Sequence, residues 1–66
     1  MKNLSSTDQL TWIKAKYSKT GFEKYNEIET LLRVTTAEGE DLYYTQYYST
    51  EREAINDAYK FLNPDL

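Results

Sequence analysis

The stretch that constrains the fold most is residues 29–48, because one turn there separates two segments of strand character. Gly39 lies in a short polar segment where a tight reversal needs a left-handed residue. The incoming segment alternates in the manner of a half-buried strand, and the return segment is rich in tyrosine, which suits a pleated surface. We therefore expect a hairpin with strands at 29–36 and 41–48. The alternation predicts that one face of the first strand meets the core through Ile28, Thr30, Leu32 and Val34.

Tyrosine occurs on both faces of the predicted return strand. Regular alternation puts Tyr44 and Tyr48 on one face, with Leu42, and Tyr43 and Tyr47 on the other. A two-layer domain can cover only one of these faces, and an exposed aromatic face is typical of a contact surface. A second copy of the chain is one candidate for the partner, since a homodimer would add to a small core. The residues expected at this contact or dimer seam are Tyr44, Tyr47 and Tyr48.

A helix is expected on each side of the hairpin. At the N-terminal side, Ser6 and Gln9 have capping-box spacing and predict a helix from about Thr7 to Tyr17, although residues 10–17 also alternate tolerably as a strand. At the C-terminal side, Thr50 begins a helix over 50–62, which the segment 63–64 stops. Its predicted apolar stripe comprises Ala54, Ile55, Ala58, Phe61 and Leu62.

Residues 20–28 can be interpreted either as a short helix or as a strand near 22–25. The strand is favoured because two strands alone make a poor sheet. The predicted fold class is therefore α+β, with an N-terminal helix, a small antiparallel sheet and a C-terminal helix. The whole chain, 1–66, is expected to be a single small domain.

Composition argues against several classes of function. The 66 residues include no cysteine and no histidine, so disulfides, the usual zinc ligands and the commonest general base are all missing. No nucleophile and base occur in a recognisable pattern, so we expect no enzyme, no catalytic residue, no cofactor and no metal. No stretch approaches the roughly 20 apolar residues of a membrane span, and no signal peptide is recognisable, so we expect no membrane association and a cytoplasmic location.

Charge is distributed unevenly along the chain. Residues 34–66 carry two basic side chains against seven acidic ones, a balance of −5, which disfavours direct binding to duplex DNA. Such acids could instead present negative charge in the manner of a phosphate backbone. The candidates for this edge are Glu38, Glu40, Asp41, Glu51 and Glu53.

Weak binding of single-stranded nucleic acid is an alternative, since aromatic strands can stack bases. That interpretation needs cations beside the tyrosines. No basic residue occurs between Arg33 and Arg52, so the cations would have to come from Lys14, Lys16, Lys19 and Lys24.

The pattern over residues 25–62 resembles the small phage-encoded uracil-DNA glycosylase inhibitors. The resemblance rests on the leucine pair 31–32, the turn 38–40, the aromatic pairs 43–44 and 47–48, and a Ser/Thr-capped acidic helix. It implies a dimeric DNA mimic that binds the glycosylase, in the host cytoplasm if phage-encoded. Acidic side chains would replace phosphates, and an apolar pocket would capture the side chain that the enzyme wedges into the duplex.

Size, acidity and layout also suit an anti-CRISPR-type inhibitor. A tyrosine-faced homodimeric interaction module without mimicry remains the other interpretation.

Overall fold

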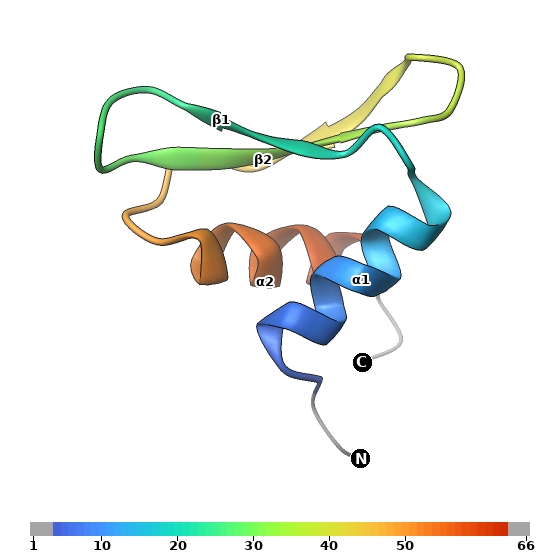
Figure 1. The fold of residues 1–66 in the computed structure, drawn as a ribbon, viewed down its shortest axis with the longest axis horizontal. Coiled ribbons are helices and arrows are strands. Elements are labelled where there is room, and N and C mark those ends of the chain that lie inside the picture. Colours follow the sequence, from blue (N-terminus) through green and yellow to red (C-terminus); the bar gives the residue numbers. More distant parts are fainter. Residues whose placement is uncertain (1–3, 64–66) are drawn as a thin grey trace.

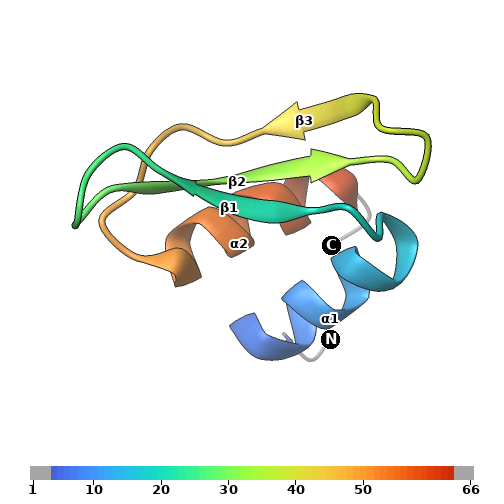
Figure 2. The same cartoon turned by 45° about the horizontal axis from the view of Figure 1, so that its top comes forward.

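A three-stranded antiparallel sheet and two helices make up the fold in the computed structural model, which describes residues 4–63. The order along the chain is α1 (Ser6–Lys16), β1 (Gly21–Lys24), β2 (Thr30–Thr35), β3 (Asp41–Tyr44) and α2 (Glu51–Leu62). Strand β2 is central, and both helices lie against the same face of the sheet (Figures 1 and 2). The α+β class and the short strand near 22–25 are thus confirmed.

Both helices begin at side-chain caps. The Thr50 hydroxyl accepts a hydrogen bond from the Glu53 backbone N–H at 3.3 Å, as the capping box predicts. For α1 the predicted cap is wrong by one residue. Ser5, not Ser6, is the N-cap, and its hydroxyl accepts from the Asp8 N–H at 3.2 Å. The strand alternative for residues 10–17 is wrong, since α1 extends to Lys16.

The core lies between the helices and the covered face of the sheet. Small alanines on α2 let that helix approach β2 closely, and they are fully buried. Two predictions about the core are wrong. Ile28 is 69% exposed because β2 begins only at Thr30, and Phe61 is 54% exposed while Tyr59, two positions earlier, is buried at 4%. The buried cluster comprises Ile13, Leu32, Val34, Ala54, Ile55, Ala58 and Tyr59.

The hairpin turns at Gly39, whose φ of 93° lies in the left-handed region, as its sequence position predicts. The Gly39 N–H donates to the Thr36 carbonyl and the Thr36 N–H donates to the Glu40 carbonyl, each at 2.9 Å. Just before this turn, the pairing of β2 with β3 shifts register between Val34 and Thr35.

The return strand ends earlier than predicted, at Tyr44 rather than residue 48. At the next position the Thr45 hydroxyl takes the place of a backbone acceptor, because the Leu32 N–H donates to Thr45 Oγ1 at 3.1 Å. Pairing resumes only where Thr30 and Tyr48 exchange backbone hydrogen bonds of 2.8 and 2.7 Å. Between these contacts β2 spans two residues and the return segment three. The extra residue reverses the alternation, so the predicted grouping of Tyr48 with Tyr44 is wrong.

Candidate functional site

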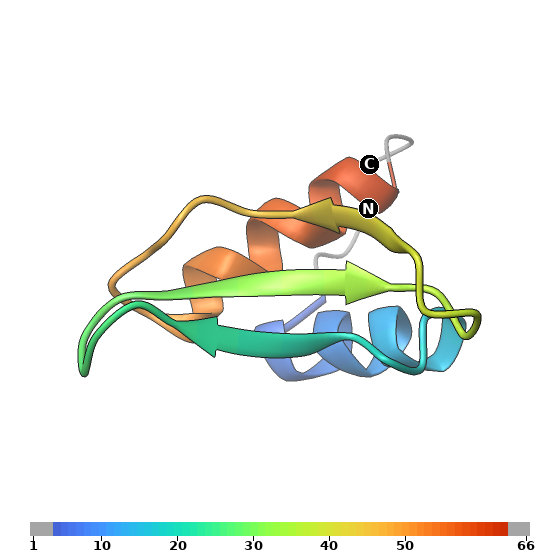
Figure 3. The same ribbon diagram turned by 90° about the horizontal axis from the view of Figure 1, so that it is seen from above.

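One face of the sheet is left bare, since among residues 4–63 both helices lie on the opposite side (Figure 3). We call it the uncovered face and define it by two groups of side chains. Arg33 of the central strand lies in the middle of it beside the Tyr44 ring, and the rings of Tyr25 and Tyr47 pair at one end. The defining residues are Glu23, Tyr25, Arg33, Asp41, Tyr44 and Tyr47.

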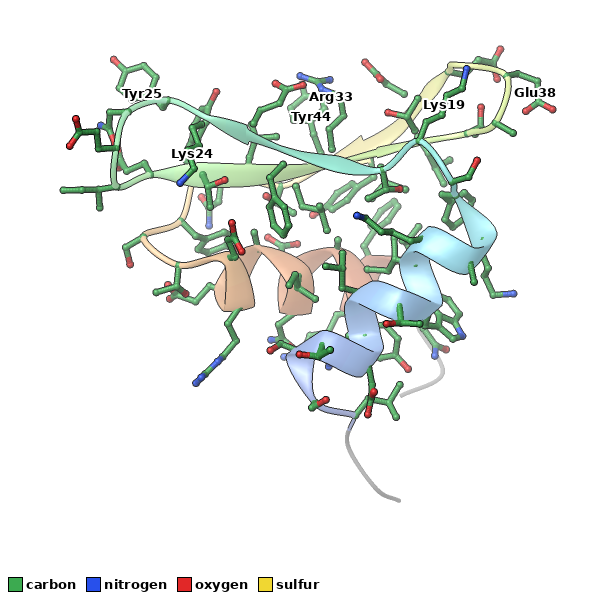
Figure 4. The ribbon with its side chains drawn as sticks, viewed as in Figure 1. Lys19, Lys24, Tyr25, Arg33, Glu38 and Tyr44 are labelled. Atoms are coloured by element: carbon green, nitrogen blue, oxygen red, sulfur yellow. The ribbon has the colours of Figure 1, made fainter. Side chains whose placement is uncertain are left out.

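Arg33 is held by a carboxylate from each neighbouring strand. Its guanidinium forms a two-pronged contact with Glu23 of β1, through Nε and through an Nη2–Oε1 hydrogen bond of 3.0 Å. On the other side, Nη1 donates to Asp41 Oδ2 at 2.9 Å. The Tyr44 ring centroid lies 5.3 Å from the guanidinium carbon, within the range of a cation–π contact. Figure 4 shows Arg33 and Tyr44 pointing away from the helices.

These contacts neutralise most of the charge on the uncovered face. The hydrogen bonds from Arg33 hold the pKa of the Glu23 carboxyl below its usual value, and the same bonds raise the pKa of Arg33. Both groups therefore stay ionised and paired at neutral pH. Asp41 adds one carboxylate, so these three side chains carry a net charge of −1. The middle of the face is polar but offers no unpaired cation to a phosphate.

Two further tyrosines pair at one end of this face. The rings of Tyr25 and Tyr47 lie 5.5 Å apart between centroids at 53°, and Tyr25 is 71% exposed. The turn after β1 fixes Tyr25 in place. Its N–H donates to the Glu29 carbonyl at 3.0 Å, while the Asn26 side-chain oxygen accepts from the N–H groups of Ile28 and Glu29 at 2.8 and 2.7 Å. The pair is thus presented by a hydrogen-bonded turn.

Tyr43 and Tyr48 lie on the covered face instead. Their hydroxyls donate to the two carboxylate oxygens of Asp57 on α2, at 2.6 Å for Tyr43 and 2.5 Å for Tyr48. The hydrogen bond to Asp57 raises the pKa of Tyr43 to about 12, and it also raises that of Tyr48. Of the three tyrosines expected at a contact surface, Tyr44 and Tyr47 are on the uncovered face and Tyr48 is a fold anchor.

The five predicted acids do not form one edge. Glu38 and Glu40 lie in the loop between β2 and β3, at the opposite end of the molecule from the start of α2, where Glu51 and Glu53 lie (Figures 1 and 3). Asp41 is bonded to Arg33, as above. Glu53 also closes the cap of α2, since its Oε1 accepts from the Thr50 hydroxyl at 3.0 Å. The structure therefore separates the acids into two exposed pairs.

The lysines proposed to hold phosphates are separated too. Lys14 and Lys16 belong to α1, in the layer behind the sheet. Figure 4 shows Lys24 pointing toward the helix side, and Lys19 projecting from the end of the molecule opposite Tyr25. Of these four lysines only Lys24 is at the Tyr25 end of the sheet, and its side chain points to the opposite side.

An open depression of about 340 Å³ lies against α2, lined by Tyr48, Glu53, Asn56, Asp57 and Lys60. Both carboxylates in it are engaged in hydrogen bonds that stabilise the fold, Glu53 at the helix cap and Asp57 with the two tyrosines. Within residues 4–63, no three acidic, histidine or cysteine side chains are grouped so as to hold a metal ion. Neither described helix has the length and apolar character that a membrane span requires.

Three members of the uncovered face were not predicted from sequence: Glu23, Tyr25 and Arg33. Arg33 gave a signal, because it alternates with the buried residues of β2 and so must point away from the helices. The sequence gives no such signal for Tyr25, because residues 20–28 can be interpreted as either a helix or a strand and the two would point its ring in different directions.

Comparison with known proteins gives no relative for this chain: no protein-family model, no curated protein and no solved structure matches it.

Proposed function

We propose that this chain is a small non-catalytic protein-binding module, and that it contacts its partner through the uncovered face. The observation that carries the proposal is the convergence of three exposed tyrosines on a face that no described helix covers. Tyr25, Tyr44 and Tyr47 are 71%, 61% and 42% exposed. Tyrosine brings a large apolar ring with a polar tip to an interface at low conformational-entropy cost, which is why it is enriched at binding hot spots.

Charge supports a protein partner over a nucleic acid. A single-stranded nucleic acid needs cations beside the stacking rings. On this face Arg33 is already bonded to Glu23 and Asp41, and Lys19 is at the far end. A protein surface needs no such cations, because tyrosine hydroxyls and ring faces bind backbone and side-chain groups of either polarity.

Inhibition of a DNA-processing enzyme is the specific form of this proposal that the family resemblance implies, with uracil-DNA glycosylase as the first candidate and an anti-CRISPR-type target as the second. Two exposed acid pairs favour it, Glu38 with Glu40 and Glu51 with Glu53. The first pair offers two carboxylates to a phosphate-binding surface, and the second offers that of Glu51, because the Glu53 carboxylate is engaged in the helix cap. Mimicry would then rely on two separate acidic contacts, one at each end of the molecule, in addition to the tyrosine face.

Titration calorimetry with purified bacterial uracil-DNA glycosylase tests both forms. Tyr25→Ala combined with Tyr47→Ala should weaken binding at least about tenfold if the uncovered face is the contact. Glu51→Lys should instead raise the dissociation constant and reduce its dependence on salt concentration if the acids replace phosphates. Glu51 is preferred to Glu53 for this test because it takes no part in the cap described above.

The outcomes separate the two forms. Binding that duplex DNA displaces and that Glu51→Lys weakens supports mimicry. Binding that only the tyrosine variant weakens supports a module without mimicry. Absence of binding to the glycosylase rejects that target, and capture from nuclease-treated bacterial lysate then asks whether any protein binds the wild type but not the tyrosine variant.

A further inference from the structure

The outer edge of β3 offers backbone hydrogen bonds to another strand. In the sheet order β1-β2-β3, no described strand pairs with this edge. The Thr45 N–H donates to the Leu32 carbonyl at 3.1 Å, so the backbone of Thr45 points toward β2. By alternation, the N–H and C=O of the preceding Tyr44 point outward. Such groups form a ready template for one more strand.

Exposed apolar side chains flank this edge on both sides of the sheet. Tyr44 is 61% exposed on the uncovered face, and Leu42, in the same strand, is 44% exposed. On the helix side, Phe61 is 54% exposed and stacks on Tyr43, with ring centroids 4.0 Å apart and planes at 7°. A strand added here would gain backbone hydrogen bonds along the edge of β3. It would also bury apolar side chains on both sides of the sheet.

The two edges of the sheet differ in their protection. Strand β1 carries Lys24, and a lysine is a common means by which proteins keep an edge strand from pairing. Strand β3 has the sequence DLYY, without lysine or proline. Its single charge, Asp41, is at the strand start and is bonded to Arg33. The edge of β3 is therefore the one that lacks a charged barrier.

We propose that the outer edge of β3 pairs with β3 of a second copy of this chain, antiparallel about a two-fold axis near Tyr43. In this register Leu42 of one copy lies beside Tyr44 of the other, twice over, and the two Asp41 side chains lie at opposite ends of the pairing. No like charges face each other, so the strand is electrostatically compatible with itself. The product is a continuous six-stranded sheet in which two uncovered faces join into one tyrosine surface. This pairing does not depend on the proposed function.

Sedimentation velocity over a range of concentrations tests the pairing. The wild type should move from the 7.8 kDa monomer to twice that mass as its concentration rises. Leu42→Lys should raise the dissociation constant of the dimer at least about tenfold, because it puts a solvated ammonium against the partner strand. Ile28→Lys is the matched control. It makes the same change at an exposed site in the turn between β1 and β2, and should leave the dissociation constant nearly unchanged.

Amide hydrogen exchange on the wild type gives a second readout that needs no substitution. Protection of the Tyr44 N–H should increase with protein concentration, while that of Thr45, already bonded to β2, should not change. A monomer at several hundred micromolar, equal effects of the two lysine variants, or concentration-independent exchange at Tyr44 would each overturn the pairing. A monomer whose capture of another protein is lost with Leu42→Lys would also overturn it, and would assign the edge to a strand from that protein.

Failure here is distinguishable from failure of the proposed function. A monomer that still loses its partner through Tyr25→Ala and Tyr47→Ala refutes the edge pairing and supports the contact face. A dimer for which neither tyrosine substitution alters any binding refutes the contact face and supports the pairing.

Discussion

The two faces of the sheet use the same residue type in opposite ways. On the covered face, Tyr43 and Tyr48 direct both hydroxyls to one carboxylate of α2. On the uncovered face, Tyr44 and Tyr47 leave their rings to solvent, beside the ion-paired Arg33 and the ring of Tyr25. The extra residue between Thr45 and Tyr48 reverses the alternation of the return segment, and this puts Tyr47 on the uncovered face and Tyr48 on the covered face. The comparison teaches that a tyrosine-rich strand can serve stability and recognition at once, by dividing its rings between two layers.

The largest expected difference between the faces concerns the adjacent leucines of β2. Leu32 is fully buried in the core cluster, whereas Leu31 is 5% exposed and lies outside that cluster, in register with Glu23. Leu32→Ala should lower the free energy of unfolding by about 2–5 kcal/mol. Leu31 is buried too, so Leu31→Ala should fall near the lower end of that range, at about 2 kcal/mol, because side chains on the uncovered face can relax into the space. Urea unfolding measures both. Equal losses would mean that the uncovered face is as rigidly packed as the core.

Removal of the shared carboxylate should have the next largest effect. Asp57→Ala leaves two tyrosine hydroxyls without their acceptor, and should lower the free energy of unfolding by about 1–3 kcal/mol, since both hydroxyls are partly accessible to water. The matched control is Glu51→Ala on the same helix, which should change it by less than about 0.5 kcal/mol. If the two variants were equally stable, the covered tyrosines would not be anchors.

The covered tyrosines should also make stability sensitive to alkaline pH. A hydroxyl that donates to Asp57 must keep its proton, so its folded pKa lies above the ordinary value of 10.0, at about 12 for Tyr43. The contribution is fully present below pH 10 and is lost between pH 10 and 12, where the unfolded chain releases the proton first. Urea midpoints measured from pH 9 to 12 should fall, and the fall should be smaller in Tyr43→Phe. An identical slope in that variant would contradict the assignment.

The smallest effect on stability is expected on the uncovered face. Tyr44→Ala removes a ring that is 61% exposed, and should change the free energy of unfolding by no more than about 1 kcal/mol. Tyr44→Phe, which keeps the ring and its contact with Arg33, should be neutral within error. A large loss in either variant would show that the face is structural rather than available to a partner.

Local signals in the sequence predicted most of the fold. The cap at Thr50, the turn at Gly39 and the need for a third strand each depend on a few neighbouring residues, and each was confirmed. The error at Phe61 and Tyr59 is of another kind. The two residues lie on opposite edges of the helix stripe, and tertiary contacts decide their burial. The Tyr59 ring packs against Trp12 of α1, with ring centroids 5.1 Å apart, whereas Phe61 stacks on Tyr43 and stays 54% exposed.

The candidate site could be predicted only in part. Tyr44 and Tyr47, predicted at a contact surface, are exposed in the structure, whereas Tyr48 lies on the covered face. No sequence pattern reveals that the Thr45 hydroxyl would accept a hydrogen bond from the Leu32 N–H and interrupt the ladder. The acids Glu38 and Glu51 are thirteen residues apart, and nothing in their spacing indicates that they belong to opposite ends of the molecule. Their separation depends on the direction in which α2 crosses the sheet, which only the folded chain determines.

The central claim is that recognition uses the uncovered face, and one measurement tests it most directly. Tagged wild type and the Tyr25→Ala, Tyr47→Ala double variant are compared in capture from nuclease-treated bacterial lysate, with bound proteins quantified by mass spectrometry and with Ile28→Ala as the control for an exposed apolar residue outside the face. The account predicts a protein that the wild type and the control retain and that the double variant loses. Equal retention by all three, with the double variant folded, would contradict it.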